Sequence, residues 1–235
     1  MKKILFTLLV IVILVSGCGG NGEVVSDSKT GVSVNEKDLG TESRKSYSTP
    51  KSTGATLTSE INTLLAKSDS VSSVEYSHRE FVLGEPGYNA EVWAKGNKQR
   101  HEISRQAGFA KGVRYDTIFF DLAKEEAIGY CTDEKTCEDK LDAATPLEFD
   151  DYTTETPLNL VDQITVGSKI GSSMYDDREV IIIEYEQGGN QVRVYVWDYK
   201  GLPLKYEVRD GEELIRKVEY LGLVINGVKD SDVER

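Results

Sequence analysis

The fold is decided by residues 191–209, which read QVRVYVWDYKGLPLKYEVR. Residues 191–199 alternate between two kinds of side chain, as expected for an extended strand with two distinct faces. The corner Gly201-Leu202-Pro203 ends this strand, and residues 204–209 alternate again. A strand, a tight corner and a return strand together predict an antiparallel pair.

Both faces of the first strand are bulky. One face carries Val192, Val194 and Val196, whereas the other carries Arg193, Tyr195, Trp197 and Tyr199. We therefore expect one face of the sheet to cover a core and the other to form a second, semi-apolar surface.

Strand patterns continue on both sides of this stretch. Residues 178–186 form a hairpin with residues 191–199 across Gly188-Gly189-Asn190, and Asp210-Gly211 is a turn signal before a long strand, 213–225. The C-terminal third therefore predicts an antiparallel meander of four strands.

The region upstream predicts one helix and then more strands. Thr58-Ser59-Glu60 is a capping sequence, and the spacing of Ile61, Leu64 and Leu65 gives one apolar stripe. A second short helix is expected over 157–164, with Pro157 in its first turn. Five further strands are predicted at 74–82, 88–94, 99–104, 115–122 and 127–131. The fold class is therefore mainly β with a few helices (α+β).

Three segments carry a family resemblance. Residues 194–208, VYVWDYKGLPLKYEV, resemble the lipoprotein-carrier superfamily, which includes the LolA/LolB type and related outer-membrane lipoprotein-sorting proteins. Residues 91–102, EVWAKGNKQRHE, are similar to the N-terminal hairpin of that family, and residues 219–226, EYLGLVIN, to its last long strand. The resemblance spans roughly residues 57–230.

This resemblance implies a curved antiparallel sheet that forms an unclosed half-barrel, with helices plugging the concave side. The family would hold the acyl chains of lipoproteins or other lipids in a hydrophobic cavity. One departure concerns the first hairpin, where carriers often have a basic residue followed by proline. Here the turn is Lys95-Gly96, so the latch role of that motif is not transferred.

Five aromatic side chains are the candidates for hydrophobic ligand binding. Apolar pockets with few polar groups suit acyl chains, and aromatic residues on these strands offer such a lining. The alternative is that they form the ordinary core of a β-domain. The candidates are Trp93, Phe119, Tyr195, Trp197 and Tyr199.

The N-terminus predicts export and a lipid anchor. Residues 1–18 read MKKILFTLLVIVILVSGC, in which two lysines precede an apolar run that ends in small residues and a cysteine. This pattern indicates a signal peptide, 1–17, with a lipoprotein-type cleavage site before a lipidated Cys18. The alternative, a transmembrane helix, needs about 20 apolar residues, and this run is shorter. Residues 18–56 are rich in polar and small side chains, so we expect a disordered tether followed by a folded domain, 57–235.

Cys131 and Cys137 remain as a pair after Cys18 is assigned to lipid. Exported proteins meet oxidising conditions, so a disulfide is expected, and in the chain-entropy model it contributes about 2 kcal/mol. The alternative is a metal site in which both sulfurs combine with nearby acidic residues.

Charge and motifs limit the function. The formal net charge is −12, or −14 once residues 1–17 with their two lysines are removed, which argues against nucleic acid as a partner. The two histidines, His78 and His101, lie in predicted strands, and the sequence has no nucleophile elbow or phosphate loop. We therefore expect no enzyme activity and no cofactor.

The functional hypothesis is an extracytoplasmic, membrane-anchored protein that binds a lipid or lipoprotein acyl chain. The alternative is a structural or protein-interaction module of the cell envelope that has a protein partner and no lipid ligand.

Overall fold

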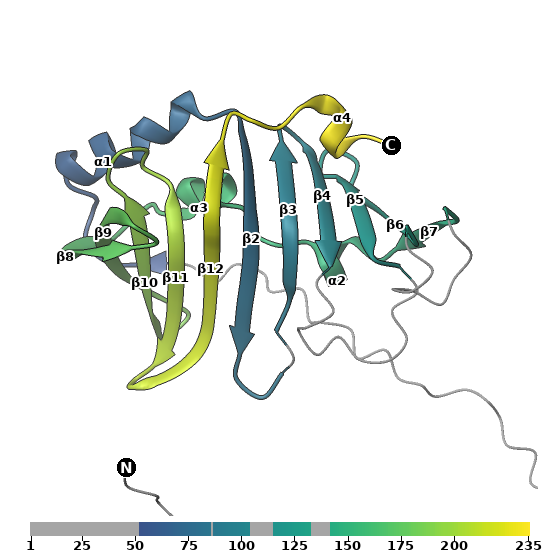
Figure 1. Ribbon diagram of the computed structural model, residues 1–235. Coiled ribbons are helices and arrows are strands. Elements are labelled where there is room, and N and C mark those ends of the chain that lie inside the picture. Colours follow the sequence, from purple (N-terminus) through teal and green to yellow (C-terminus); the bar gives the residue numbers. More distant parts are fainter. Residues whose placement is uncertain (1–51, 86, 104–114, 133–141) are drawn as a thin grey trace, which may run out of the picture. The chain divides into compact units, whose positions relative to one another are not determined.

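One antiparallel sheet organises the chain (Figure 1). The computed structural model describes residues 52–85, 87–103, 115–132 and 142–235. Within these ranges the sheet has 12 strands, in the order β1-β9-β10-β11-β12-β2-β3-β4-β5-β6-β7, and β8 pairs with β9. The strands are β1 (Ser52–Thr53), β2 (Ser73–Val82), β3 (Asn89–Lys95), β4 (Lys98–Ile103), β5 (Thr117–Asp121), β6 (Glu126–Tyr130), β7 (Ala144–Leu147), β8 (Ser168–Tyr175), β9 (Arg178–Gln187), β10 (Asn190–Trp197), β11 (Pro203–Asp210) and β12 (Glu213–Ile225).

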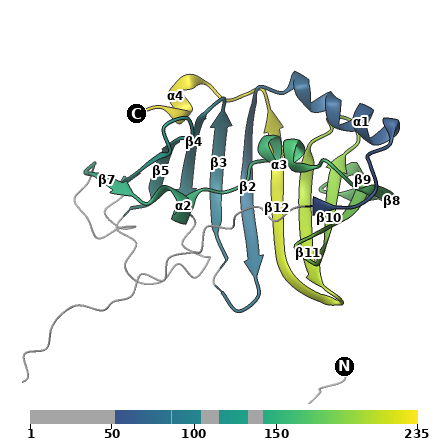
Figure 2. The same ribbon diagram turned by 180° about the vertical axis from the view of Figure 1, so that it is seen from behind.

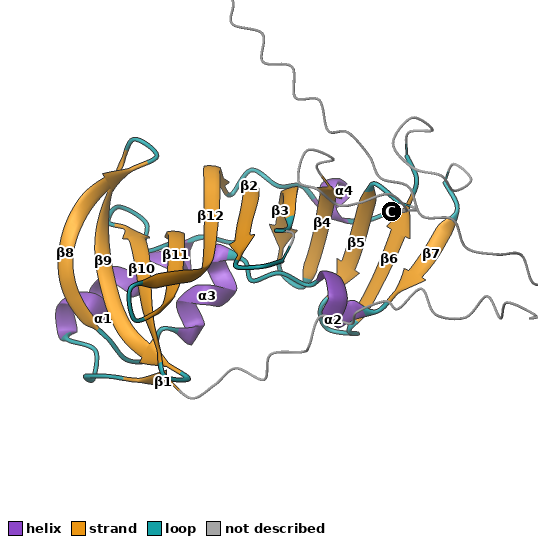
Figure 3. Cartoon of the chain, turned by 90° about the horizontal axis from the view of Figure 1, so that it is seen from below, coloured by secondary structure: helices purple, strands orange, loops and turns teal. Residues whose placement is uncertain are grey.

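The sheet does not close, because β8 and β7 lie at opposite ends of it (Figure 3). The last strand, β12, pairs with the early strand β2 and thereby joins the C-terminal meander to the N-terminal hairpins. The predicted unclosed half-barrel of mainly β structure is confirmed.

The helices are short and lie on both faces of the sheet. In chain order they are α1 (Ser59–Leu65), the 3₁₀ helix η1 (Ala66–Ser70), α2 (Phe149–Tyr152), α3 (Pro157–Gln163) and α4 (Asp230–Val233). Of these, α1, α2 and α3 cover one face of the sheet (Figure 2), whereas α4 lies against β3 and β4 on the other face (Figure 3). Thr58 caps α1 by accepting a hydrogen bond from the Ile61 amide at 3.3 Å, and Thr156 caps α3 in the same way through the Asn159 amide. In the described part of the chain, no helix is long and apolar enough to span a bilayer.

The core lies between the sheet and α1, α2 and α3. Alternate side chains of the meander point into it: Val192, Val194 and Val196 are 2%, 0% and 0% exposed. Ile61, Leu64 and Leu65 from α1 and Leu160 from α3 pack in the same cluster. The alternation read from residues 191–199 therefore assigned the two faces of β10 correctly.

The corner Gly201-Leu202-Pro203 explains how α1 approaches the sheet so closely. Gly201 has a φ of +68°, and a Cβ atom at this position would lie 2.2 Å from the Leu64 carbonyl oxygen. Only glycine fits such a conformation and such a contact without displacement of the helix. Leu202 and Leu204 are then fully buried.

The structure differs from the sequence expectation in three places. The folded part begins before residue 57, because Ser52 and Thr53 pair with β9 in a segment expected to be disordered. The strand β8 was not predicted, since its sequence SKIGSSMY has little alternation. The strand β7 was not predicted either; it contains Pro146, and a proline is tolerated there because β7 is an edge strand.

His101 sits in the core without charge. Its side chain is 0% exposed, its Nδ1 lies 2.9 Å from the Tyr88 hydroxyl, and its Nε2 lies 3.0 Å from Gln99 Oε1. The Gln99 oxygen can only accept, so Nε2 carries the proton and Nδ1 accepts from Tyr88. Burial, with a smaller contribution from His78, lowers the pKa of His101 to about 3.

We predict that His101 makes stability depend on pH. An unfolded histidine, with a pKa near 6.5, binds a proton that the folded one rejects, so stability is complete above pH 6.5 and falls as the pH drops toward 3. His101→Gln keeps a donor and an acceptor but removes this titration. Between pH 7 and pH 5, urea unfolding of the wild type should lose about 2 kcal/mol more than the variant loses. Equal losses in both proteins would contradict the assignment.

Candidate functional site

A groove of about 320 Å³ opens between α1 and the edge of the sheet. Its floor is apolar and consists of Ile61 and Leu64 from α1 and Ile181 from β9. Its rim is polar and combines residues from α1, η1, β8 and the β10–β11 loop, namely Ser59, Glu60, Thr63, Lys67, Lys169 and Asp198. An apolar floor with a few polar groups at the mouth is typical of a small-molecule site.

The groove exists because α1 is short and rests on the corner of the sheet. A helix of seven residues is not stable alone, so α1 depends on the burial of its apolar stripe. That stripe packs above the Gly201 corner, and the polar side of α1 forms the wall of the groove. On the sheet side, Ile181 lies opposite Val196 of β10 and is half-buried, because α1 covers it incompletely.

Two ion pairs connect the walls of the groove. Lys169 of β8 lies 2.6 Å from Glu60 of α1, and Lys67 of η1 donates to the Asp198 carbonyl at 2.5 Å and lies 3.4 Å from its carboxylate. All four side chains are more than a third exposed to solvent. Such ion pairs contribute at most about 1 kcal/mol each to stability, so the charged side chains at the rim can change partners at little cost in free energy.

Beside α3, the covered face carries a partly buried polar cluster, here called the Arg216 cluster: Glu80, Glu155, Tyr206, Arg216 and Tyr220. Arg216 lies 2.9 Å from Glu80 and 3.8 Å from Glu155. Tyr206 donates to the Glu155 carboxylate at 2.7 Å, and Tyr220 donates to the Glu155 carbonyl at 3.0 Å. These contacts hold the segment before α3 against β11 and β12.

Burial keeps the donors of this cluster protonated. It raises the pKa of Tyr206 and of Tyr220 well above the usual value, and the Glu155 carboxylate adds to the effect. The side chain of Glu80 is only 5% exposed, and its carboxylate forms an ion pair with Arg216. This part of the covered face is therefore fixed, in contrast to the rim of the groove.

The five predicted aromatic residues do not line the groove. Trp93, Phe119, Tyr195 and Trp197 lie at strand positions that alternate with the buried ones, on the face opposite α1, α2 and α3. Tyr199 is 70% exposed in the β10–β11 loop. The sequence indicated correctly that Tyr195 and Trp197 face away from the valines of β10, but it did not show which face these three helices cover.

Cations cover most of these rings. The Arg100 guanidinium lies 3.9 Å from the centre of Trp93, and that of Arg178 lies 4.6 Å from Trp197. Phe119 contacts Tyr130 edge-on, with ring centres 5.7 Å apart. Cation–π pairs of this kind stabilise half-buried aromatic rings on a solvent-facing sheet. They also leave the rings less free to accept an apolar chain.

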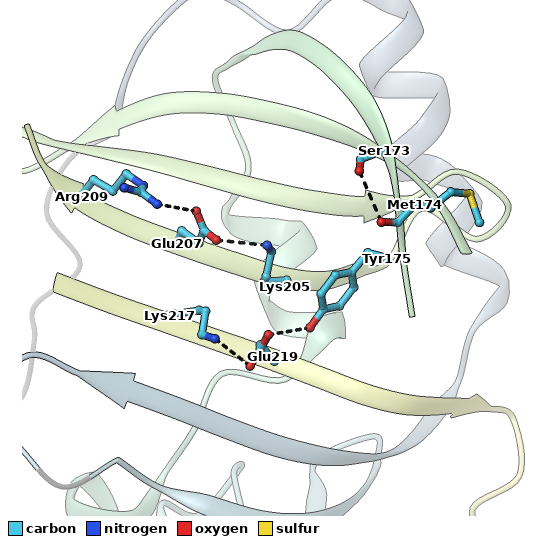
Figure 4. Close-up of polar contacts among 8 residues, drawn as sticks. All are labelled: Ser173, Met174, Tyr175, Lys205, Glu207, Arg209, Lys217 and Glu219. Atoms are coloured by element: carbon cyan, nitrogen blue, oxygen red, sulfur yellow. Dashed lines mark hydrogen bonds and ion pairs between the residues drawn. The ribbon is translucent and has the colours of Figure 1, made fainter. Parts of the chain in front are cut away.

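A polar network that includes Tyr175, Lys205, Glu207 and Glu219 lies on the same face (Figure 4). Lys205 lies 3.7 Å from the Tyr195 ring and 3.1 Å from Glu207. Tyr175, at the end of β8, reaches across to donate to Glu219 of β12 at 2.9 Å. Burial alone would raise the pKa of Glu207, but the hydrogen bond from Lys205 and the nearby Arg209 hold it below its usual value. This network ties the end of β8 to the outer face and offers no apolar opening.

The predicted cysteine and metal sites are only partly within the described residues. Cys131 is 1% exposed at the end of β6, whereas Cys18 and Cys137 lie outside the described ranges. The disulfide and the lipid attachment therefore stay predictions. In the ranges that are described, His, Cys, Asp and Glu side chains form no group that would hold a metal ion.

The groove residues were not found from the sequence. Glu60 and Lys169 are 109 residues apart, and Lys67 and Asp198 are 131 residues apart. Such pairs come together only through the order of strands in the sheet. The apolar stripe of α1 was the single local signal, and it identified a packing face and not the wall of a groove.

Comparisons with known proteins give a likeness of fold. No protein-family model matches the chain, and no curated protein sequence matches it. A conserved uncharacterized protein from Thermus thermophilus has 11% identity and a TM-score of 0.46, with 75% of this chain and 91% of that one covered. MucB of Pseudomonas aeruginosa, solved in complex with MucA, has 13% identity and a TM-score of 0.46, with 75% and 60% covered, so this chain spans less than two thirds of it.

A LolA superfamily protein from Nitrosomonas europaea has 12% identity and a TM-score of 0.32, with 74% of this chain and 97% of that one covered.

We predict that Arg216 stabilises the fold because it forms an ion pair with the nearly buried carboxylate of Glu80. Arg216→Met should lower the free energy of unfolding by about 3 kcal/mol, since it leaves the Glu80 carboxylate buried without its cation. Glu80→Gln combined with Arg216→Met should recover much of this loss. Arg193→Met is the control, because its partner Glu184 is 24% exposed and the expected loss is below about 1 kcal/mol. Equal losses in the two arginine variants, measured by denaturant unfolding, would contradict this role.

Proposed function

We propose that the chain is a membrane-anchored extracytoplasmic lipoprotein whose half-barrel holds an acyl chain of a lipid or of a lipoprotein. The observation that carries this proposal is the groove beneath α1, with its apolar floor of Ile61, Leu64 and Ile181. Each methylene group that leaves water contributes about 0.8 kcal/mol, so even a partly inserted chain gains several kcal/mol before the entropic costs of binding.

The packing of the described part of the covered face supports a binding site at this groove. Tyrosine rings fill the core between sheet and helices, since Tyr76, Tyr88 and Tyr220 are at most 1% exposed. The outer face is occupied by cation–π pairs and ion pairs. An acyl chain therefore finds apolar surface at the α1 end.

We propose that the protein acts without catalysis. His101 is buried, and both of its ring nitrogens are engaged by Tyr88 and Gln99. With a pKa of about 3 it stays neutral at physiological pH and has no access to a bound molecule. Holding hydrophobic cargo near a membrane requires only the groove and the anchor.

The groove is tested by filling it. Ile181→Trp places a bulky ring on its floor, and we expect the variant to lose at least tenfold in affinity for a fluorescent fatty acid. Ile182→Trp is the matched control, because Ile182 lies on the same strand, is also half-buried and faces Tyr195 on the other side of the sheet. Both are measured by titration of the mature chain carrying Cys18→Ser, so that no lipid of its own competes.

Two outcomes of this titration would count against the proposal. Equal affinity in the two tryptophan variants would place the acyl chain elsewhere. A mature chain that binds no fatty acid would favour the alternative, an interaction module of the cell envelope without a lipid ligand.

The anchor is tested through Cys18. We expect the wild-type chain to sediment with membranes and Cys18→Ser to lose the mass of the lipid and appear in the soluble exported fraction. Cys137→Ser serves as the control and should remain with the membranes. A Cys18→Ser chain that still resists alkaline extraction from membranes would indicate a transmembrane anchor in its place.

A further inference from the structure

The mouth of the groove carries two lysines on different walls. Lys67 belongs to η1, and Lys169 belongs to β8. Each is neutralised by an acidic residue, Asp198 or Glu60, so the rim has no net charge when both ion pairs are formed. Whether the groove favours an anionic or a cationic head group therefore depends on which member of each ion pair, the acid or the lysine, a ligand replaces more easily.

The two halves of each pair differ in exposure. The side chain of Glu60 is 67% exposed, whereas that of Lys169 is 37% exposed. Asp198 and Lys67 differ in the same direction, at 46% and 39%. A displaced Glu60 returns to water at little cost, whereas a lysine that stays at the groove wall without a counter-ion is penalised by its partial burial. An incoming anion is thus favoured over an incoming cation, most clearly at the Lys169–Glu60 pair.

Lys169 is also the better placed of the two lysines. Lys67 is held by the Asp198 carbonyl oxygen in addition to the carboxylate, so it keeps an acceptor even when the ion pair opens. Among the residues that the structure describes, Lys169 has its ion pair with Glu60 alone. The lysine of β8 therefore gains more from a new anionic partner.

The size of the groove limits the apolar part of the ligand. A volume of about 320 Å³ lies at the lower end of the range of roughly 300–1,000 Å³ for ligand sites. The floor is formed by three apolar side chains in one row between α1 and β9. One acyl chain fits this shape, whereas the two or three chains of a lipoprotein anchor need more room.

Resting on the acyl-chain function proposed above, we propose that the groove selects single-chain amphiphiles with an anionic head group. The acyl chain lies on Ile61, Leu64 and Ile181, and the carboxylate or phosphate of the head group replaces Glu60 as the partner of Lys169. A fatty acid and a lysophospholipid with an exposed phosphate share this chemistry.

The proposal is tested with three twelve-carbon probes that differ only in head-group charge: dodecanoate, dodecanol and dodecyltrimethylammonium. Calorimetric titration of the mature Cys18→Ser chain at pH 8 should give dodecanoate an affinity about fivefold above that of dodecanol, with the cation weakest. The preference should shrink at high salt, because the pairs at the rim are exposed.

Two substitutions act in opposite directions. Lys169→Gln should remove the preference for dodecanoate over dodecanol, whereas Glu60→Gln should increase dodecanoate affinity because it frees Lys169. Lys95→Gln is the control, since Lys95 pairs with Asp230 away from the groove and its loss should change neither probe.

The outcomes separate this inference from the function on which it rests. Equal binding of dodecanoate and dodecanol, or a preference that survives Lys169→Gln, would overturn the anionic selectivity and leave acyl-chain binding standing. Strongest binding of the cationic probe would reverse the assignment. Failure of all three probes to bind would remove the acyl-chain function itself. Dodecanoate compared with a lysophosphatidate of the same chain length then distinguishes a carboxylate from a phosphate head group.

Discussion

The pairing of β2 with β12 is the constraint on which the rest of the structure depends. It joins strands that begin 140 residues apart, at Ser73 and Glu213, and merges the N-terminal hairpins and the C-terminal meander into one sheet. It also positions α1. The side chain of Asn226, directly after β12, accepts from the Ser72 amide at 2.7 Å and donates to the Ser70 carbonyl at 3.1 Å. The end of η1 is thus fixed to the end of β12. Because α1 directly precedes η1, this contact also holds α1 against the β10–β11 corner. Long-range pairing of this kind is entropically costly to close, so the groove depends on contacts between segments far apart in the sequence.

The two faces of this sheet solve the burial problem differently. The valines and tyrosines of the inner face are covered by α1, α2 and α3, which exclude water from them. On the outer face, α4 lies against β3 and β4, and guanidinium or ammonium groups lie over most of the aromatic rings instead. The strands therefore carry large side chains on both faces, although only one face forms a core. This arrangement also explains why aromatic content was a poor guide to the site: the rings that looked available for a ligand already have cationic partners.

Local sequence signals predicted most of the fold and little of the site. Hairpins were read correctly wherever a turn sequence separated alternating runs, as at Lys95–Lys98 and Asp210-Gly211, because both strands and the turn are local. The strand β8 was missed because its exposed, small side chains carry no alternation, and its pairing is imposed by β9. The unclosed half-barrel came from a family resemblance and not from periodicity. The walls of the groove could not be predicted, because Glu60, Lys67, Lys169 and Asp198 meet only after strand order has been fixed by tertiary structure.

The contrast between the two ends of the covered face determines where it can open. At the α3 end, the Arg216 cluster contains a nearly buried carboxylate, Glu80, and buried tyrosine hydroxyls, so separation of its members exposes uncompensated polar groups. At the α1 end, the contacts that cross the groove are exposed ion pairs, and a helix of seven residues rests on three apolar side chains. The apolar stripe of α1 is buried, so the helix itself stays in place, and it is the exposed ion pairs at the rim of the groove that open at little cost. In the function proposed above, an acyl chain therefore enters between these ion pairs, while α1, the sheet and the Arg216 cluster form the frame around it.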